Sequence, residues 1–101
     1  MFIQLVQFET DRFEEGQRIS EEWRERTRGK PTTVRRIAVC KDRDNADRYV
    51  VIVEFDSYED AMSNSEMPET QEFSEKMSAL NKGPTQFVNL DVLELTEPAT
   101  A

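Results

Sequence analysis

Residues 48–56, with the sequence RYVVIVEFD, constrain the fold more than any other part of the chain. Most of them are β-branched or aromatic, which favours a strand. Apolar side chains fall on both alternating faces, namely Tyr49, Val51, Val53 and Phe55 on one face and Val50 and Ile52 on the other. A strand of this kind lies in the middle of a sheet whose two faces are both covered. The chain must therefore build a sheet around this segment and find cover for each side.

The elements around this central strand follow a known order. From the N-terminus we expect a strand over 2–9, a helix over 12–28, strands over 33–41 and 48–56, a second helix between Ser57 and Gly83, and a strand over 85–95. This β-α-β-β-α-β sequence of elements is the split βαβ, or ferredoxin-like, order. Right-handed crossovers then place both helices on one face of a four-stranded antiparallel sheet. We expect one such α+β domain over residues 1–95 and a flexible polar tail over 96–101.

The helix ends carry recognisable signals. Thr10 or Asp11 is expected to cap the first helix, and Gly29 is expected to end it. Ser57 is expected to cap the second helix. This helix should break over Asn64–Pro68, because proline fits the first turn of a restarted helix.

The sheet face away from the helices is expected to be apolar. In the first, third and fourth strands, the odd-numbered and the even-numbered residues both include large apolar side chains. Whichever of these two parities faces the helices, the other therefore leaves large apolar residues on the opposite face. A monomer would expose them as a patch that needs a cover. The simplest cover is the same sheet of a second copy, packed face to face about a two-fold axis. We therefore predict a homodimer, and the alternative is a monomer whose open face binds a polar ligand.

The charge balance excludes several classes of partner. The chain of 101 residues has 13 basic and 21 acidic residues, a formal net charge of −8, which repels nucleic-acid backbones and anionic lipids. The densest basic stretch lies within residues 24–36. Its first half shares the expected helix with several glutamates, so we interpret it as a solvated helix face of mixed charge. No apolar run approaches the roughly 20 residues that span a bilayer, and the N-terminus lacks a signal-peptide pattern. The prediction is a cytoplasmic protein without nucleic-acid or membrane partners.

The sequence contains no histidine and one cysteine, Cys40. The absence of histidine removes the usual general base near neutral pH and the commonest metal ligand. It excludes Ser-His and Cys-His nucleophilic sites, and haem, zinc or copper held by histidine. We therefore expect no metal and no cofactor. Cys40 lies in an apolar-periodic segment and is expected to be a buried, inert thiol.

Polar residues inside the strands are the first candidates for a binding site, namely Gln4, Gln7, Arg36, Asn89 and Asp91. Such residues either pair with one another or line a pocket. Of the strand carboxylates, Asp91 is expected to be more buried than Glu54, and a buried carboxylate with a raised pKa could act as a base. A structural hydrogen-bonding role is the alternative. The aromatic residues Trp23 and Phe73 are interpreted as helix contributions to the core or to a pocket wall.

A local stretch resembles a known family. The sequence VIVEFDSYEDA over residues 51–61, followed by Asn64, Pro68 and the triplet QEF at 71–73, is similar to antibiotic biosynthesis monooxygenase-like domains of the dimeric α/β-barrel superfamily. The resemblance implies a dimer with facing sheets and a pocket between sheet and helices in each subunit. Some members oxidise aromatic polyketides without metal or flavin, and others degrade haem. Phe55 stands where tryptophan is common, and Asn64 and Thr70 lie where a histidine is often found, which argues against the haem-degrading branch.

The leading hypothesis is a dimeric small-molecule-binding domain similar to cofactor-independent monooxygenases that act on an aromatic or polyketide-like substrate. In this hypothesis Gln7 and Asn64 orient a polar substituent, and Asp91 is the candidate base. The predicted pocket walls are Phe55, Tyr58, Trp23 and Phe73. The alternative is a non-catalytic ligand-binding or interaction module of the same fold, because fold alone does not decide activity.

Overall fold

The computed structural model describes residues 1–99 of the chain. The elements are β1 (Phe2–Glu9), α1 (Phe13–Thr27), β2 (Val34–Lys41), β3 (Arg48–Phe55), α2 (Tyr58–Glu66), α3 (Pro68–Ser78) and β4 (Gln86–Asp91). All the expected strands and helices form, and the second helix is divided into α2 and α3 as its predicted break requires. The last two residues of the predicted flexible tail, 100–101, lie outside the described residues.

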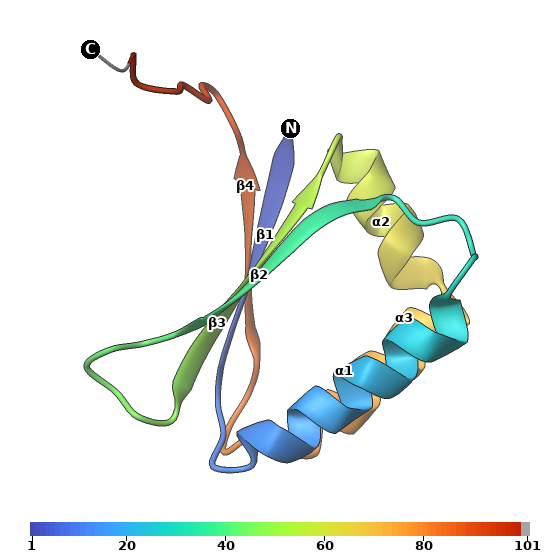
Figure 1. The fold of residues 1–101 in the computed structure, drawn as a ribbon, viewed down its shortest axis with the longest axis vertical. Helices are drawn as coiled ribbons and strands as arrows, with labels where there is room; N and C mark the ends of the chain where they lie inside the picture. Colours follow the sequence, from blue (N-terminus) through green and yellow to red (C-terminus); the bar gives the residue numbers. More distant parts are fainter. Residues whose placement is uncertain (100–101) are drawn as a thin grey trace.

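The sheet has the predicted ferredoxin-like topology. Its four strands follow the order β2-β3-β1-β4, and every neighbouring pair is antiparallel. All helices lie on one side of this sheet (Figure 1). The two central strands, β1 and β3, pair along their full lengths from Phe2 opposite Phe55 to Glu9 opposite Arg48. This regular register fixes which residues share a face.

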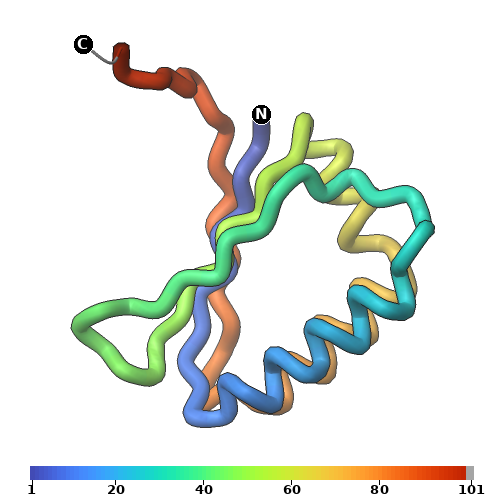
Figure 2. The backbone as a smooth tube through the Cα atoms, in the orientation of Figure 1, coloured from blue at the N-terminus to red at the C-terminus, as the bar shows by residue number. Residues whose placement is uncertain are grey.

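The last strand is shorter than predicted. It was expected to reach Leu95 but ends at Asp91, which pairs with Phe2, the first residue of β1. One further backbone bond, from the Val92 N–H to the Met1 carbonyl at 3.0 Å, uses the last available partner. Beyond it no neighbouring strand remains, so the chain leaves the sheet (Figure 2). The prediction was too long because the apolar sequence pattern extends beyond the last residue that has a neighbouring strand to pair with.

The start of α1 differs from the prediction. Its N-cap is Arg12, which makes no side-chain capping bond, rather than Thr10 or Asp11. The Thr10 hydroxyl accepts a bond from the Arg12 N–H at 3.0 Å and donates to the Leu80 carbonyl at 2.8 Å. This buried hydroxyl therefore joins the approach to α1 to the segment after α3. The other end is as predicted, since Gly29 has a φ of 79°, which favours glycine.

The helix break is narrower than predicted. The Ser57 hydroxyl caps α2 by accepting from the Asp60 N–H at 3.1 Å, and Pro68 occupies the first turn of α3, as expected. Met67 alone separates the two helices, and its N–H donates to the Asn64 carbonyl at 3.3 Å. Asn64 therefore lies in the last helical turn of α2 and not in an irregular segment.

The helix layer is built by α1 and α3, which run side by side (Figure 2). Gly16 lets them approach, because a methyl group at this position would lie 3.1 Å from the Met77 Cε. Trp23 packs on Phe73 with ring centroids 5.4 Å apart. Two ion pairs add to this contact. Arg26 of α1 binds Glu72 of α3 at 2.9 Å, and Lys30, which follows α1, binds Glu69 of α3 at 2.8 Å. The aromatic side chains predicted for the core thus pack on one another between the helices.

The helices contact the sheet most closely at its two ends. At one end, Phe2 and Phe55 are buried with Ala61 of α2. At the other end, Phe13 of α1 stacks on Tyr49 with ring centroids 4.3 Å apart. Each end is therefore closed by an aromatic cluster.

The centre of the same face is less well covered. Val6, Val51 and Val53 are only partly buried. Towards the edges, Val39 is 58% exposed and Phe87 is 55% exposed, although both belong to the helix-facing parity. A filled core would bury these side chains. Solvent therefore reaches the middle of the sheet on the side that carries the helices.

Candidate functional site

The helix-facing centre of the sheet carries an amide pair. Alternation along β1 places Phe2, Gln4, Val6 and Phe8 on this face, and Gln4 is the polar member of this set. Its Nε2 donates to the Oδ1 of Asn89 on β4, directly opposite in the register, at 3.2 Å. The two amides thus lie between the aromatic clusters, where the helices leave the sheet partly accessible. The interpretation that polar strand residues pair with one another is confirmed here.

Gln7 lies on the other face of the sheet. It pairs in the register with Val50 and Gln86, and its Oε1 accepts a bond from the Arg48 guanidinium at 2.8 Å. Gln7, Arg48 and Gln86 line a groove of about 190 Å³ where β1 ends and β4 begins. The sheet separates Gln7 from Asn64 within one chain, so the two cannot orient the same substituent from a single copy. A ligand-binding role for Gln7 stays a prediction.

The burial of the two strand carboxylates, Asp91 and Glu54, differs from the expectation. Asp91 is exposed, because it is the last residue of an edge strand, whereas the Glu54 side chain is only 17% exposed. Glu54 accepts two bonds from Arg36, at 2.9 and 3.0 Å, on the open face. These bonds raise the pKa of Arg36. The prediction that Asp91 is the more buried carboxylate is wrong, although its parity does place it beside Asn89 on the helix-facing side.

Asn64 lies on the side of α2 that suits a site between the helices and the sheet. It follows buried Ala61 by three residues, which places both side chains on one face of the helix. Its side chain is half-buried and makes no hydrogen bond within residues 1–99. Of the predicted walls nearby, Phe55 is 2% exposed and enclosed, whereas Tyr58 is 49% exposed and stands edge-on to Phe2 at 5.4 Å. Asn64 and Tyr58 are therefore accessible, whereas Phe55 is enclosed in the core with Phe2 and Ala61.

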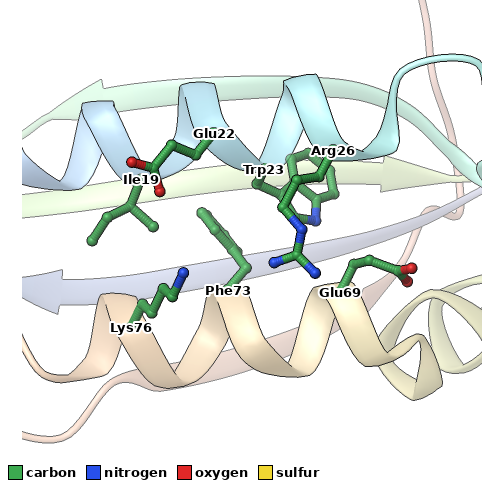
Figure 3. A pocket seen from close by; sticks show the side chains of 7 residues that line it. All are labelled: Ile19, Glu22, Trp23, Arg26, Glu69, Phe73 and Lys76. Carbon is green, nitrogen blue, oxygen red and sulfur yellow. The ribbon is translucent and has the colours of Figure 1, made fainter.

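The helix layer brings Trp23 and Phe73 together. Figure 3 shows both side chains between α1 and α3, surrounded by charged side chains. The groove at this point has a volume of about 10 Å³, enough for one water molecule. Trp23 Nε1 and the Thr70 hydroxyl are buried without a hydrogen-bond partner in residues 1–99. An unpaired buried donor costs about 1–3 kcal/mol, so this layer retains unused hydrogen-bonding capacity.

Cys40 is exposed and not buried as predicted. It lies on β2, an edge strand, and its register partner Val50 belongs to the face without helices. Within residues 1–99, no cluster of carboxylates and thiols is arranged to hold a metal ion. In the same part of the chain, no helix is both long enough and apolar enough to cross a bilayer.

The amide pair is the feature that sequence reasoning did not select. Both Gln4 and Asn89 were recognised as polar strand residues, but Gln7 was preferred for the pocket. The signal that could have identified Gln4 was its parity. Gln4 shares its strand face with Phe2 and Phe8. Their large aromatic side chains are better suited to the helix-facing core than Ile3 and Leu5 on the other face.

The arrangement of elements is shared with oxygenases of known structure. SnoaB, a cofactor-independent oxygenase from Streptomyces nogalater, has a TM-score of 0.77 and 14% identity, over 97% of this chain and 97% of that one. The crystal structure of an antibiotic biosynthesis monooxygenase has a TM-score of 0.74 and 14% identity, over 93% of this chain and 100% of that one. A protein from Mycobacterium tuberculosis has a TM-score of 0.75 and 12% identity, over 95% of this chain and 98% of that one. No model of a protein family matches the sequence, and no curated protein does so either.

These likenesses confirm the fold that the sequence resemblance implied. The chain has the same fold as these solved antibiotic biosynthesis monooxygenase and oxygenase structures. At such low identity the likeness concerns architecture, and activity has to be argued from the site itself.

Proposed function

We propose that the protein binds a small aromatic molecule between its sheet and its helices and oxidises it with dioxygen without a cofactor. The observation that carries this proposal is the uncovered, partly polar centre of the helix-facing surface, closed at both ends by aromatic clusters. A flat apolar ligand with polar substituents suits such a surface. The fold shared with a cofactor-independent oxygenase supports the same reaction class.

The chemistry requires an electron-rich substrate with an activated ring CH₂ group, as in an anthrone. The substrate loses one proton from this group, and the resulting carbanion donates electrons to dioxygen, forming a C–O bond. Protonation gives a hydroperoxide, which loses water as its O–O bond and the second C–H bond break. One oxygen atom ends in the new carbonyl and the other in water. The protein supplies burial and hydrogen bonds to the developing anion.

The roles follow the positions of the side chains. Asn64, whose amide is free of side-chain bonds within residues 1–99, would donate to the anion from α2. Asp91 would accept the proton from the edge of the sheet, on the same face. Tyr58, Trp23 and Phe73 would contact the rings, with the unpaired Trp23 Nε1 as an additional donor.

We further propose that the open face of the sheet is covered by a second copy. The residues that share this face in the two central strands include Ile3, Leu5, Val50 and Ile52. They continue onto β4 through Val88, which is 36% exposed, and Leu90, which is 40% exposed. A surface of this kind needs a partner, and a two-fold dimer supplies an identical one.

The activity is tested by oxygen uptake in the presence of a chelator. The substrate is 1,8-dihydroxyanthrone, an anthrone whose hydroxyls flank its carbonyl and which is called anthrone below. The expected result is uptake above the uncatalysed rate, with one labelled oxygen atom in the product when ¹⁸O₂ is used. Uptake that disappears on addition of chelator, or that equals the rate without protein, would refute a cofactor-free oxygenase.

A second candidate is a binding module without catalysis. The exposed position of Asp91 favours it, because a base in water has little advantage over the solvent. Binding of anthrone without enhanced oxygen uptake would select this candidate.

A further inference from the structure

Gln4 occupies a position where a closed core would place an apolar side chain. It lies on a central strand, and its neighbours on the helix-facing surface are Phe2, Val6 and Val53. A polar group among such neighbours needs partners, and one hydrogen bond to Asn89 satisfies only part of an amide.

The pair has unused groups of complementary kind. Since Gln4 donates through Nε2 and Asn89 accepts through Oδ1, the Oε1 of Gln4 and the Nδ2 of Asn89 have no other side-chain partner in residues 1–99. One is an acceptor and the other a donor, and the pair is exposed. A ligand can therefore reach both groups without any rearrangement of the sheet.

The charges around the pair favour a neutral ligand. The helix-facing residues of β1, β3 and β4 include no lysine or arginine. Asp91 follows Asn89 on the same face of β4, and the whole chain has a net charge of −8. A carboxylate or phosphate would be repelled here. The flanking Phe87 is apolar and 55% exposed, which suits a ring.

We propose that Gln4 and Asn89 recognise a neutral, planar ring that carries a hydrogen-bond donor directly beside a carbonyl, as a lactam or an enolised diketone does. The ligand donor bonds to Gln4 Oε1, and the ligand carbonyl accepts from Asn89 Nδ2. The ring lies over Phe87 and the valines of the centre. This inference deepens the proposed function, because it names the substrate class of the same helix-facing site.

Gln7 provides an internal control. It is the same residue type on the same strand, but it lies on the opposite face and its Oε1 is already bonded to Arg48. A site at Gln7 would present a guanidinium and favour anions, whereas the site at Gln4 presents neutral amides. The two glutamines therefore distinguish the two faces within one chain.

The test uses carbostyril, a neutral bicyclic lactam, and N-methylcarbostyril, which lacks the donor, as probes in NMR titrations. We expect wild type to bind carbostyril about tenfold more tightly than the methylated probe, since hydrogen bonds of ordinary strength are lost. Gln4→Leu should weaken carbostyril binding by about the same factor, while Gln7→Leu leaves it unchanged. Asn89→Ala, on an exposed edge position, serves as the second variant in case Gln4→Leu does not fold.

The proposal is overturned if wild type does not bind carbostyril or does not prefer it to the methylated probe. It is also overturned if Gln7→Leu weakens binding while Gln4→Leu and Asn89→Ala do not. Carbostyril binding that depends on Gln4, in a protein that shows no oxygen uptake with anthrone, would support the amide site and refute the proposed oxygenase activity. The two hypotheses can therefore fail separately.

Discussion

The two faces of the sheet have opposite patterns. The helix-facing side is aromatic and buried at its ends, around Phe55 and Tyr49. Its centre is partly polar, because Gln4 bonds to Asn89 among the valines. The open side is apolar at its centre and polar at its ends, where the pair Arg36–Glu54 and the set Asp42, Gln7 and Arg48 lie. An apolar centre with a polar rim is the usual anatomy of a protein–protein interface. A polar centre between aromatic clusters is better suited to a small ligand.

The largest expected effect comes from a charge at the centre of the open face. Ile52→Glu should convert the proposed dimer to a monomer at micromolar concentration, because a carboxylate would be buried without a partner. Ile52 is the suitable position, since the register places its neighbours Val51 and Val53 on the side that faces the helices. Light scattering after size-exclusion chromatography measures the change.

Val39→Glu is the matched control for this test. Val39 is also a strand valine, but it has the helix-facing parity and is 58% exposed, so a charge should leave the dimer intact. A monomeric wild type would contradict the assignment of the open face as an interface.

The next prediction compares the loss of stability at an end of the helix-facing side with the loss at its centre. Phe55→Ala should reduce the free energy of unfolding by about 3–5 kcal/mol, because it empties an enclosed site. Val51→Ala at the centre should cost about 1 kcal/mol, since its side chain is only partly buried. Urea unfolding followed by circular dichroism measures both. Equal losses at the two positions would mean that the helices close over the centre in solution.

Asn64 is expected to act on ligand binding more than on stability. Asn64→Ala should weaken binding of an aromatic ligand while lowering the free energy of unfolding by about 1 kcal/mol or less, because its side chain bonds to no other residue in 1–99. NMR titration and urea unfolding together check this prediction. If the variant unfolds, or if ligand-induced shifts lie far from α2, then Asn64 has only a structural role.

The sequence was sufficient for the elements but not for the choice of face. Alternation predicted β1 and β3 and the apolar character of both sheet faces, because it reports the period of two residues directly. It could not say which parity meets the helices, since both are apolar, and so Gln7 was preferred to Gln4. That choice is decided by packing between elements distant in sequence, such as Phe2 with Ala61.

Errors at the sheet edges have a common cause. Leu95 was expected in β4, Asp91 was expected to be buried, and Cys40 was expected to be an internal thiol. All three positions belong to, or follow, the edge strands β2 and β4, where a neighbour is missing on one side. Composition and periodicity describe a residue's preference for burial, but the order of strands in the sheet determines whether cover is available.

The smallest expected effect concerns the ion pair between Arg26 and Glu72, which joins α1 to α3 in the helix layer. Bonds from Arg26 and then Lys76 lower the pKa of Glu72 below its ordinary value of 4.5. A carboxylate with a lowered pKa stabilises the fold above its ordinary pKa, and this contribution is lost as the pH falls through the lowered value. Thermal unfolding at low salt should therefore show a melting temperature that declines on acidification below about pH 4.5, less steeply in Glu72→Gln than in wild type.

Glu75→Gln is the matched control. Glu75 lies on the same helix but makes no ion pair within residues 1–99, so this variant should retain the wild-type pH dependence. The Glu72 and Arg26 side chains are both about half exposed, so the difference between the variants should be small and should diminish further at about 1 M salt. If Glu72→Gln instead matches Glu75→Gln at every pH, then the Arg26–Glu72 pair adds nothing to the packing of Trp23 on Phe73 and the close approach at Gly16.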